Sequence, residues 1–142
     1  MRVGWTLTEL VVVVVVLGLL MGTTAPRLAA LRDRAAVRAA AAVVRSALAA
    51  ARDEARNRAA PTVLALDAAE RRVIVLAGSG TSRDTVLVQP LAPELGVSLE
   101  RTGDSVRFAP SGIGYGVSNT TIVLRRGDAA DTLRVSRLGR VR

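Results

Sequence analysis

The feature that most constrains this chain is an apolar run near its start. Leu10–Ala25 comprises 16 residues without a charge, and six of them are consecutive valines, Val11–Val16. In water a valine run favours a strand, but in lipid every backbone group must be hydrogen-bonded within its own segment, which forces a helix. With the five residues in front, the segment has 21 residues, and a transmembrane helix needs roughly 20. We therefore expect residues 5–25 to form a membrane-spanning helix.

One carboxylate, that of Glu9, stands at the entrance of this apolar run. A carboxylate costs roughly 2.5–3.5 kcal/mol near the centre of a bilayer and less near its edge, so such residues usually have a partner. A secretory signal peptide fits poorly, because Glu9 offsets the charge of Arg2 and Pro26 would directly follow the small residues of a cleavage site. A plain membrane anchor explains the length of the segment but leaves the acid unexplained.

The residues around Glu9 form a recognisable motif. A Gly, an aromatic residue, Thr, Leu, any residue and Glu follow one another as Gly4, Trp5, Thr6, Leu7, Thr8 and Glu9. This order resembles the start of type IV prepilins and type II secretion pseudopilins, in which Phe is more usual than Trp and the leader is longer. Pro26 also resembles the proline that these proteins carry where the membrane-embedded part of the helix ends.

The resemblance implies how the N-terminus matures. Residues 1–4 are expected to be a leader that a prepilin peptidase removes after Gly4 on the cytoplasmic side. The same enzyme would then methylate the new amine of Trp5. In the filament, Glu9 would pair with the N-terminal amine of a neighbouring subunit, because in low dielectric the pair offsets a desolvation cost that neither charge could bear alone.

The resemblance also implies a location and partners. We expect a single-pass protein of the bacterial inner membrane, with its C-terminal domain in the periplasm and with incorporation into a filament. Arg2 agrees with a cytoplasmic leader by the positive-inside rule. Membrane lipid would surround the helix before assembly, and other pilins or pseudopilins would surround it afterwards.

Residues 26–60 read as an amphipathic periplasmic helix that continues the first one. Pro26 is expected to kink the helix without ending it, and Pro61 to stop it. Ala, the strongest helix former, dominates the segment. Apolar residues at helical spacing form one stripe that we expect to pack on a domain: Val37, Val44, Leu48, Ala51 and Ala55. A row of arginines on another face is interpreted as solvated: Arg34, Arg38, Arg45, Arg52 and Arg56.

Residues 61–142 read as a β-rich globular head. Strand-like stretches alternate with turn residues at 62–66, 72–76, 85–89, 97–101, 105–108, 120–126 and 131–137. The first two, the fourth with the fifth, and the last two are expected to pair as hairpins. The predicted fold class is therefore α+β, a long N-terminal helix packed on a small antiparallel β-sheet domain, as in pilins.

The tail of the chain narrows the resemblance. FAPSGIG at Phe108–Gly114, the stretch TTIVLRRGD and the ending at Gly139–Arg142 resemble the GspH/FimT group of minor pilins and pseudopilins. This resemblance implies a GspH-like structural pseudopilin that assembles into a periplasmic pseudopilus for protein secretion by a type II secretion system. The alternative is a FimT-like minor pilin of a type IV pilus that binds DNA through its basic end for natural transformation.

Composition argues against an enzyme. The chain has no Cys and no His, which excludes a thiolate zinc site and a Cys/His or Ser/His catalytic pair. The chain offers Ser111 no His, Lys or Cys as a base, and the glycines at 112–116 precede strand-like sequence, whereas a phosphate-binding loop opens a helix. We expect no catalytic site, no metal and no cofactor.

Arginine is concentrated at the C-terminal end. The net charge is +8, and residues 125–142 contribute six Arg against two acids. The candidate DNA-binding residues are Arg125, Arg126, Arg137, Arg140 and Arg142, since arginine binds phosphates well. With three aromatic residues in the chain, such binding would be independent of sequence and steeply salt-sensitive. The simpler alternatives are a solvated edge that prevents sheet-to-sheet aggregation, or a contact with an acidic neighbouring subunit.

Overall fold

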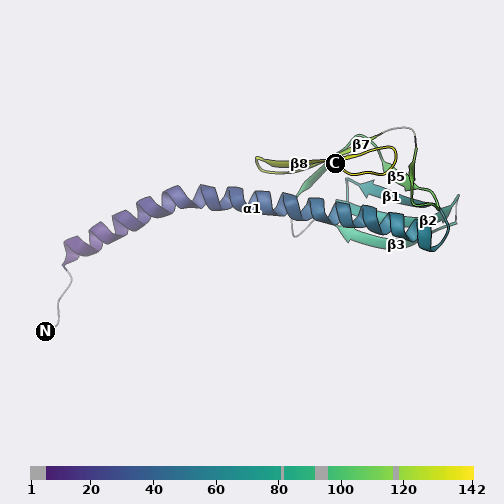
Figure 1. Cartoon of the computed structure of the whole chain (residues 1–142). Helices are drawn as coiled ribbons and strands as arrows, with labels where there is room; N and C mark the ends of the chain where they lie inside the picture. Colours follow the sequence, from purple (N-terminus) through teal and green to yellow (C-terminus); the bar gives the residue numbers. More distant parts are fainter. Residues whose placement is uncertain (1–5, 81, 92–95, 117–118) are drawn as a thin grey trace. The chain divides into compact units, whose positions relative to one another are not determined.

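One long helix begins the described structure. The computed structural model describes residues 6–80, 82–91, 96–116 and 119–142, without the side chains of residues 22–26. The chain divides into two compact units, one ending at Arg32 and one comprising Asp33–Arg142. Helix α1 runs from Leu7 to Asn57 (Figure 1), so it continues across position 26 and ends before Pro61, as predicted. The side chain of Pro26 lies outside the described residues, and the kink stays a prediction.

In the first unit the apolar side chains of α1 are uncovered. Each valine of Val11–Val16 is between 44% and 59% exposed. Within the side chains that the structure describes, no helix has the length and hydropathy that a membrane crossing requires. The membrane span over residues 5–25 stays a prediction.

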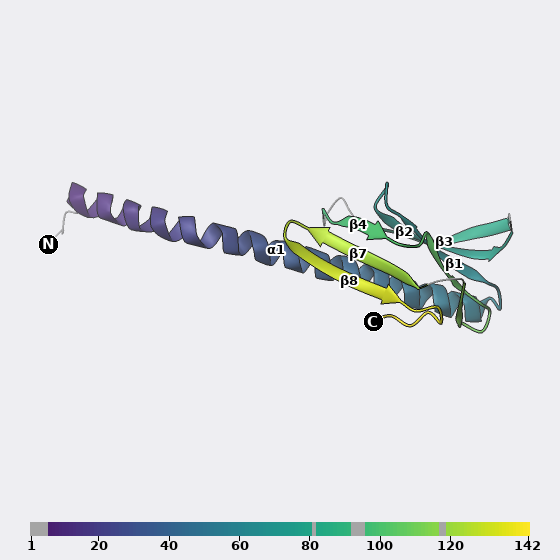
Figure 2. The same ribbon diagram turned by 90° about the horizontal axis from the view of Figure 1, so that it is seen from above.

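In the second unit, two antiparallel sheets follow the helix. Among the described residues the strands are β1 Thr62–Asp67, β2 Arg72–Ser79, β3 Ser82–Pro90, β4 Ser98–Arg101, β5 Ser105–Phe108, β6 Gly114–Tyr115, β7 Thr120–Arg126 and β8 Ala129–Val135. Sheet A has the order β3-β2-β1-β5-β6, and sheet B has the order β4-β7-β8. Figure 2 shows β7 and β8 running alongside the second half of α1. The predicted α+β class with antiparallel sheets is confirmed.

The apolar stripe of α1 forms the centre of the core. The five residues predicted for it, Val37, Val44, Leu48, Ala51 and Ala55, are at most 3% exposed. They belong to one buried cluster with alternate residues of both sheets, among them Leu64, Val75, Phe108, Ile122 and Leu133. The alanines of the stripe fill little volume, so aliphatic side chains of the strands and Phe108 supply much of the core.

Two of the three expected hairpins are present. β1 pairs with β2 from Thr62↔Ala77 to Asp67↔Arg72. β7 pairs with β8 up to Arg126↔Ala129, so the second turn has two residues, and its Gly127 has a φ of +53°. Such tight turns favour glycine because their central residues take positive φ. β8 therefore begins and ends two residues earlier than predicted.

The third expected hairpin is wrong. β4 pairs with β7 in sheet B, while β5 pairs with β1 and β6 in sheet A. The chain changes sheets at Thr102–Asp104, where the N–H of Thr102 donates to Thr121 (3.0 Å) and the carbonyl of Asp104 accepts from Leu66 (3.2 Å). Local alternation shows that each strand has a buried face, but it does not identify the partner strand.

The turn between β1 and β2 is closed by Asp67. Its carboxylate accepts a hydrogen bond from the backbone N–H of Glu70 (3.1 Å) and another from Arg72 Nε (3.1 Å). The Glu70 N–H lowers the pKa of Asp67 most, partial burial acts in the opposite direction, and the Arg72 side chain lowers it further.

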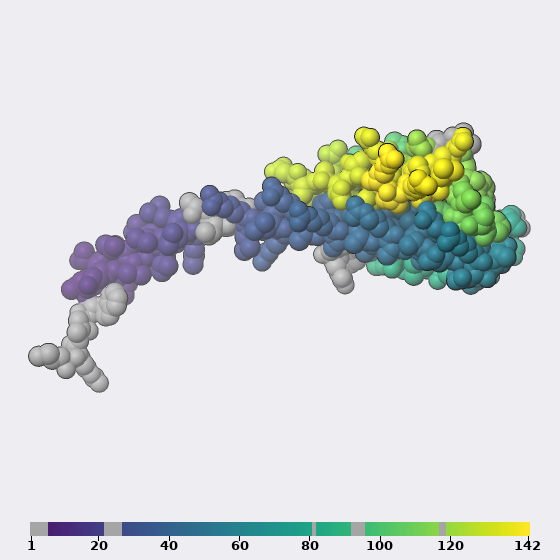
Figure 3. Space-filling model, viewed as in Figure 1, coloured from purple at the N-terminus to yellow at the C-terminus, as the bar shows by residue number. Residues whose placement is uncertain are grey.

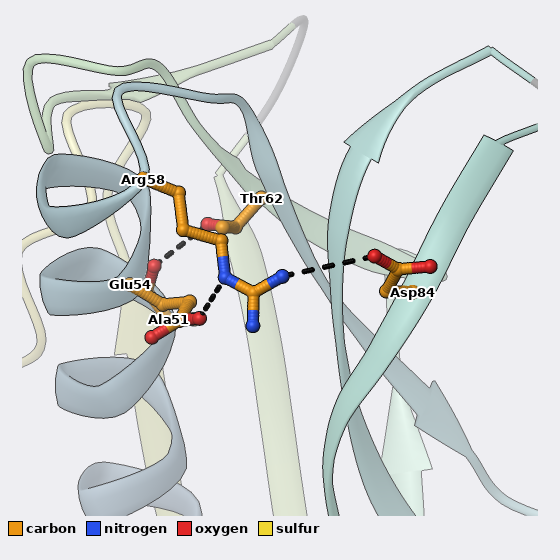
Figure 4. Close-up of polar contacts among 5 residues, drawn as sticks. All are labelled: Ala51, Glu54, Arg58, Thr62 and Asp84. Atoms are coloured by element: carbon orange, nitrogen blue, oxygen red, sulfur yellow. Dashed lines mark hydrogen bonds and ion pairs between the residues drawn. The ribbon is translucent and has the colours of Figure 1, made fainter.

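Polar contacts attach the end of α1 to sheet A (Figure 4). The buried hydroxyl of Thr62 donates to the carbonyl of Ala51 (2.7 Å). Arg58 contacts Glu54 one turn earlier and also approaches Asp84 of β3 at 3.7 Å. These contacts fix where the chain leaves the helix and enters β1.

The close packing of α1 gives a stability prediction. Ala47 is fully buried, whereas Ala49, two residues further on, is exposed. Ala47→Leu should overpack the core and destabilise the protein by about 1–3 kcal/mol, while Ala49→Leu should change the stability little. Urea unfolding of the full chain in detergent measures both. Equal midpoints for the two variants would contradict the close approach of helix and sheets.

Candidate functional site

The first candidate site is the start of α1. Glu9 Oε2 accepts hydrogen bonds from the Thr6 backbone N–H (2.9 Å) and from the Thr6 hydroxyl (3.0 Å), and the Thr6 hydroxyl accepts one from the Glu9 N–H (3.3 Å). This reciprocal pattern is a capping box, which satisfies backbone N–H groups that the first helical turn leaves unpaired. Gly4 and Trp5, the predicted cleavage and methylation residues, lie outside the described residues.

The capping box gives Glu9 a role in the isolated chain. Its carboxylate is exposed, and it stabilises the helix N-terminus, where negative charge is favourable. The sequence carried this signal as Thr-x-x-Glu before an apolar run, and our reasoning from the sequence overlooked it. The carboxylate of Glu9 therefore caps the N-terminus of its own helix and remains accessible to another molecule.

The second candidate site is the C-terminal segment after β8. The Gly139 N–H donates to the Ser136 carbonyl (2.7 Å), which closes a turn that contains Arg137. The chain then returns along β8, where Arg134 and Arg142 exchange two hydrogen bonds of 2.9 Å each and Val141 bridges Val135. In Figure 3 these last residues, drawn in yellow, cover part of the helix.

Three arginines share the outer face of sheet B. Since Leu133 and Val135 are buried, the intervening Arg134 points away from the core. Paired residues of antiparallel strands point to the same side, so Arg142 lies on this face, and so does Arg140 two residues earlier. A shallow depression is lined by all three together with Asn119 and Thr121. We call Arg134, Arg140 and Arg142 the tail cluster.

The other predicted DNA-binding residues lie elsewhere. Arg125 is at the far end of β7 and contacts Glu100 at 3.6 Å. Arg126 shares the side of Ile122 and Leu124 and forms an ion pair of 2.8 Å with Asp33 of α1. Arg137 lines a separate cleft between the two sheets. The structure thus brings Arg140 and Arg142 together and separates them from the other three candidates.

Three arginines of the row on α1 contact the head, and one of them, Arg52, contacts the tail. Arg52 donates to the carbonyl of Gly139, and its guanidinium lies 5.5 Å from the centre of the Phe108 ring. Arg56 Nε donates to the carbonyl of Ser111 (3.2 Å), and Arg45 contacts Asp131 at 3.7 Å. The interpretation of this row as solvated is therefore wrong for Arg52, which is part-buried, while Arg45 and Arg56 make these contacts and stay exposed.

Two glycines permit this tail arrangement. A Cβ on Gly114 would lie 2.5 Å from the backbone nitrogen of Gly139, so the two segments can touch only without that side chain. Gly139 has a φ of +80°, and its Cβ would lie 2.6 Å from Phe108 Cε1. The motifs at 108–114 and 139–142 therefore fit each other and the helix. No cluster of acidic side chains suited to a metal ion occurs in the described part of the chain.

Comparisons with known proteins agree with this geometry. The family model described as type II transport protein GspH matches residues 40–139. The type IV minor pilin FimU of Pseudomonas aeruginosa superposes with a TM-score of 0.61 at 16% identity, covering 77% of this chain and 88% of FimU. The minor pseudopilin EpsH of Vibrio cholerae superposes with a TM-score of 0.59 at 14% identity, covering 75% of this chain and 94% of EpsH. At such identities the two structures show a shared fold. No curated protein sequence matches the chain.

The tail arrangement predicts different costs for two glycine substitutions. Gly139→Ala should destabilise the protein through both its positive φ and the clash with Phe108. Gly80→Ala has a similar φ of +65° but open space around the new methyl group, so it should show the backbone cost alone, on the order of 1 kcal/mol. Thermal unfolding compares them. Equal losses would mean that Gly139 does not pack against Phe108.

Proposed function

The chain belongs to the GspH family of type II transport proteins, and we propose that it is a minor pseudopilin of a type II secretion system. In this proposal it assembles with other pseudopilins into a periplasmic filament. The observation that carries the proposal is the uncovered apolar surface around the helix at Val11–Val16, with Glu9 at its entrance. A contiguous apolar surface of this kind marks contact with lipid or with other proteins.

Before assembly, residues 5–25 anchor the subunit in the inner membrane. A helix is the conformation that satisfies the backbone of this segment in lipid. The capping box supports the same role, because it satisfies N–H groups at the end of the helix where no preceding turn accepts them. Prepilin peptidase cuts after Gly4 and methylates Trp5, which leaves an amine four residues before Glu9.

During assembly, Glu9 exchanges partners. In the isolated chain its carboxylate accepts two hydrogen bonds from Thr6. In the filament the same carboxylate meets the amine of a neighbouring subunit. Opposite charges attract far more strongly when water is excluded, and the packed valines of several subunits exclude it. The exchange replaces a local contact by one that requires a neighbour in the correct position.

Two variants separate capping from pairing. Glu9→Gln keeps a side chain that can cap the helix but removes the charge, so incorporation into complexes with co-expressed pilins should fall at least about ten-fold. Thr6→Ala weakens the cap and leaves the charge, so it should largely retain incorporation. Co-purification from membranes measures both. A stronger loss for Thr6→Ala than for Glu9→Gln would assign Glu9 to capping alone.

A second candidate function is DNA capture by a type IV minor pilin. The observation that favours it is the tail cluster, in which three exposed arginines line one depression. Among the described residues, no ion pair joins any of the three to an acid. Polar side chains of Asn119 and Thr121 line the same depression and add hydrogen-bonding groups. The site would contact phosphates and not bases, because no aromatic residue lines it.

Salt-dependent titration tests this second function. The full chain in non-ionic detergent is titrated with duplex DNA at several salt concentrations. If the tail cluster contacts phosphates, Arg140→Gln with Arg142→Gln should lower the slope of log affinity against log salt by about 2. Arg83→Gln with Arg125→Gln removes the same charge elsewhere and should leave the slope unchanged. Equal effects of the two pairs would rule out a localised tail site.

A further inference from the structure

A polar cleft separates the two sheets at the end away from the β7–β8 turn. Its volume is about 240 Å³, and it is lined by residues of β5, β6 and the segment after β8. Val106 and Val135, both buried in the core, are the two apolar aliphatic residues among those that line it. Arg107 of β5 and Arg137 of the turn after β8, both exposed, also line it. Neither residue belongs to the tail cluster.

The position of Arg107 is set by sheet A. It pairs with Val63 of β1 on one side and with Tyr115 of β6 on the other. Its neighbours Val106 and Phe108 are buried on the side of the helix. The alternation of a strand therefore directs Arg107 away from α1, and Arg107 lines the cleft.

The position of Arg137 is set by the turn after β8. Its backbone N–H donates to Asn119 Oδ1 (2.9 Å). The turn is closed by the Gly139 N–H on Ser136 (2.7 Å), and the Gly114 N–H donates to the carbonyl of Leu138 (3.1 Å). The backbone that carries Arg137 is thus hydrogen-bonded to Asn119, which directly precedes β7, and to β6, so the positions of both arginines are fixed by the head.

The cleft has an excess of positive charge. Within the described residues, no ion pair joins Arg107 or Arg137 to an acid, and Asp104, the one acid among the lining residues, pairs with Arg101. The hydroxyl groups of Ser105 and Tyr115 also line the cleft. Two guanidinium groups beside hydroxyls can hold an anion by charge-assisted hydrogen bonds.

We propose that this cleft binds a carboxylate side chain of a neighbouring pilin-type subunit. A concave site of this volume suits one acidic side chain, held between Arg107 and Arg137. The backbone of a duplex needs a longer basic surface, since it carries one charge per roughly 1.7 Å of helix axis. Weak binding suffices, because a subunit already held by its N-terminal helix presents its head at high effective concentration.

Nuclear magnetic resonance can test the proposal without a filament, and so independently of the role of Glu9. The full chain in non-ionic detergent is titrated with the peptide acetyl-Ala-Glu-Ala-amide and with its Gln counterpart. The Glu peptide should shift the side-chain N–H signals of Arg107 and Arg137, and the Gln peptide should not. Arg107→Gln or Arg137→Gln should each weaken binding about three- to five-fold, as for a partly exposed ion pair.

Arg140→Gln is the matched control. Arg140 is exposed, lies three residues after Arg137 and lines the other depression, that of the tail cluster. Its removal should therefore leave binding of the Glu peptide unchanged. Equal binding of the Gln peptide, or an equal loss in Arg140→Gln, would overturn the proposal. So would a short duplex DNA that shifts the Arg107 and Arg137 signals when the Glu peptide leaves them unmoved.

Discussion

Burial of the apolar stripe of α1 against both sheets is the interaction on which the head depends. Phe108 is the one aromatic side chain in the buried cluster of the described residues. The remaining volume is filled by aliphatic side chains and by alanines of the helix. Such a core is stable only if its layers approach closely, because a gap forfeits dispersion contacts on both sides. Strands β4 and β5 enter different sheets, yet each turns its buried face to the same helix.

The C-terminal motif is first of all a structural device. Arg52 connects the helix, the Phe108 ring and the Gly139 carbonyl. Gly114 and Gly139 let two loops touch where any side chain would collide. This fixed turn presents Arg137 to the cleft between the sheets, and it presents Arg140 and Arg142 to the outer face of sheet B. One short segment therefore contributes arginines to two separate basic surfaces. The sequence shows only that arginines are concentrated near the C-terminus, so the two surfaces could not be distinguished there.

Much of this arrangement could be predicted from periodicity. Helical spacing identified the buried stripe from Val37 to Ala55, and alternation identified most strands. The pairing of 97–101 with 105–108 failed because short-range pattern does not encode which sheet a strand joins. The opposite orientations of Arg125 and Arg126 could be predicted from the sequence, since Arg126 is two residues after Leu124 and four after Ile122 and so points to the same side of the strand. The role of Arg52 was not, because it depends on a carbonyl 87 residues away.

We propose that the N-terminal segment is a processed assembly helix, in which Glu9 exchanges its bonds to Thr6 for the amine of a neighbouring subunit. The most direct measurement is mass spectrometry of the mature protein isolated from membranes. We predict a polypeptide that begins at Trp5 and carries a methyl group on its N-terminal amine. An intact N-terminus at Met1, or a start near Pro26, would contradict this account.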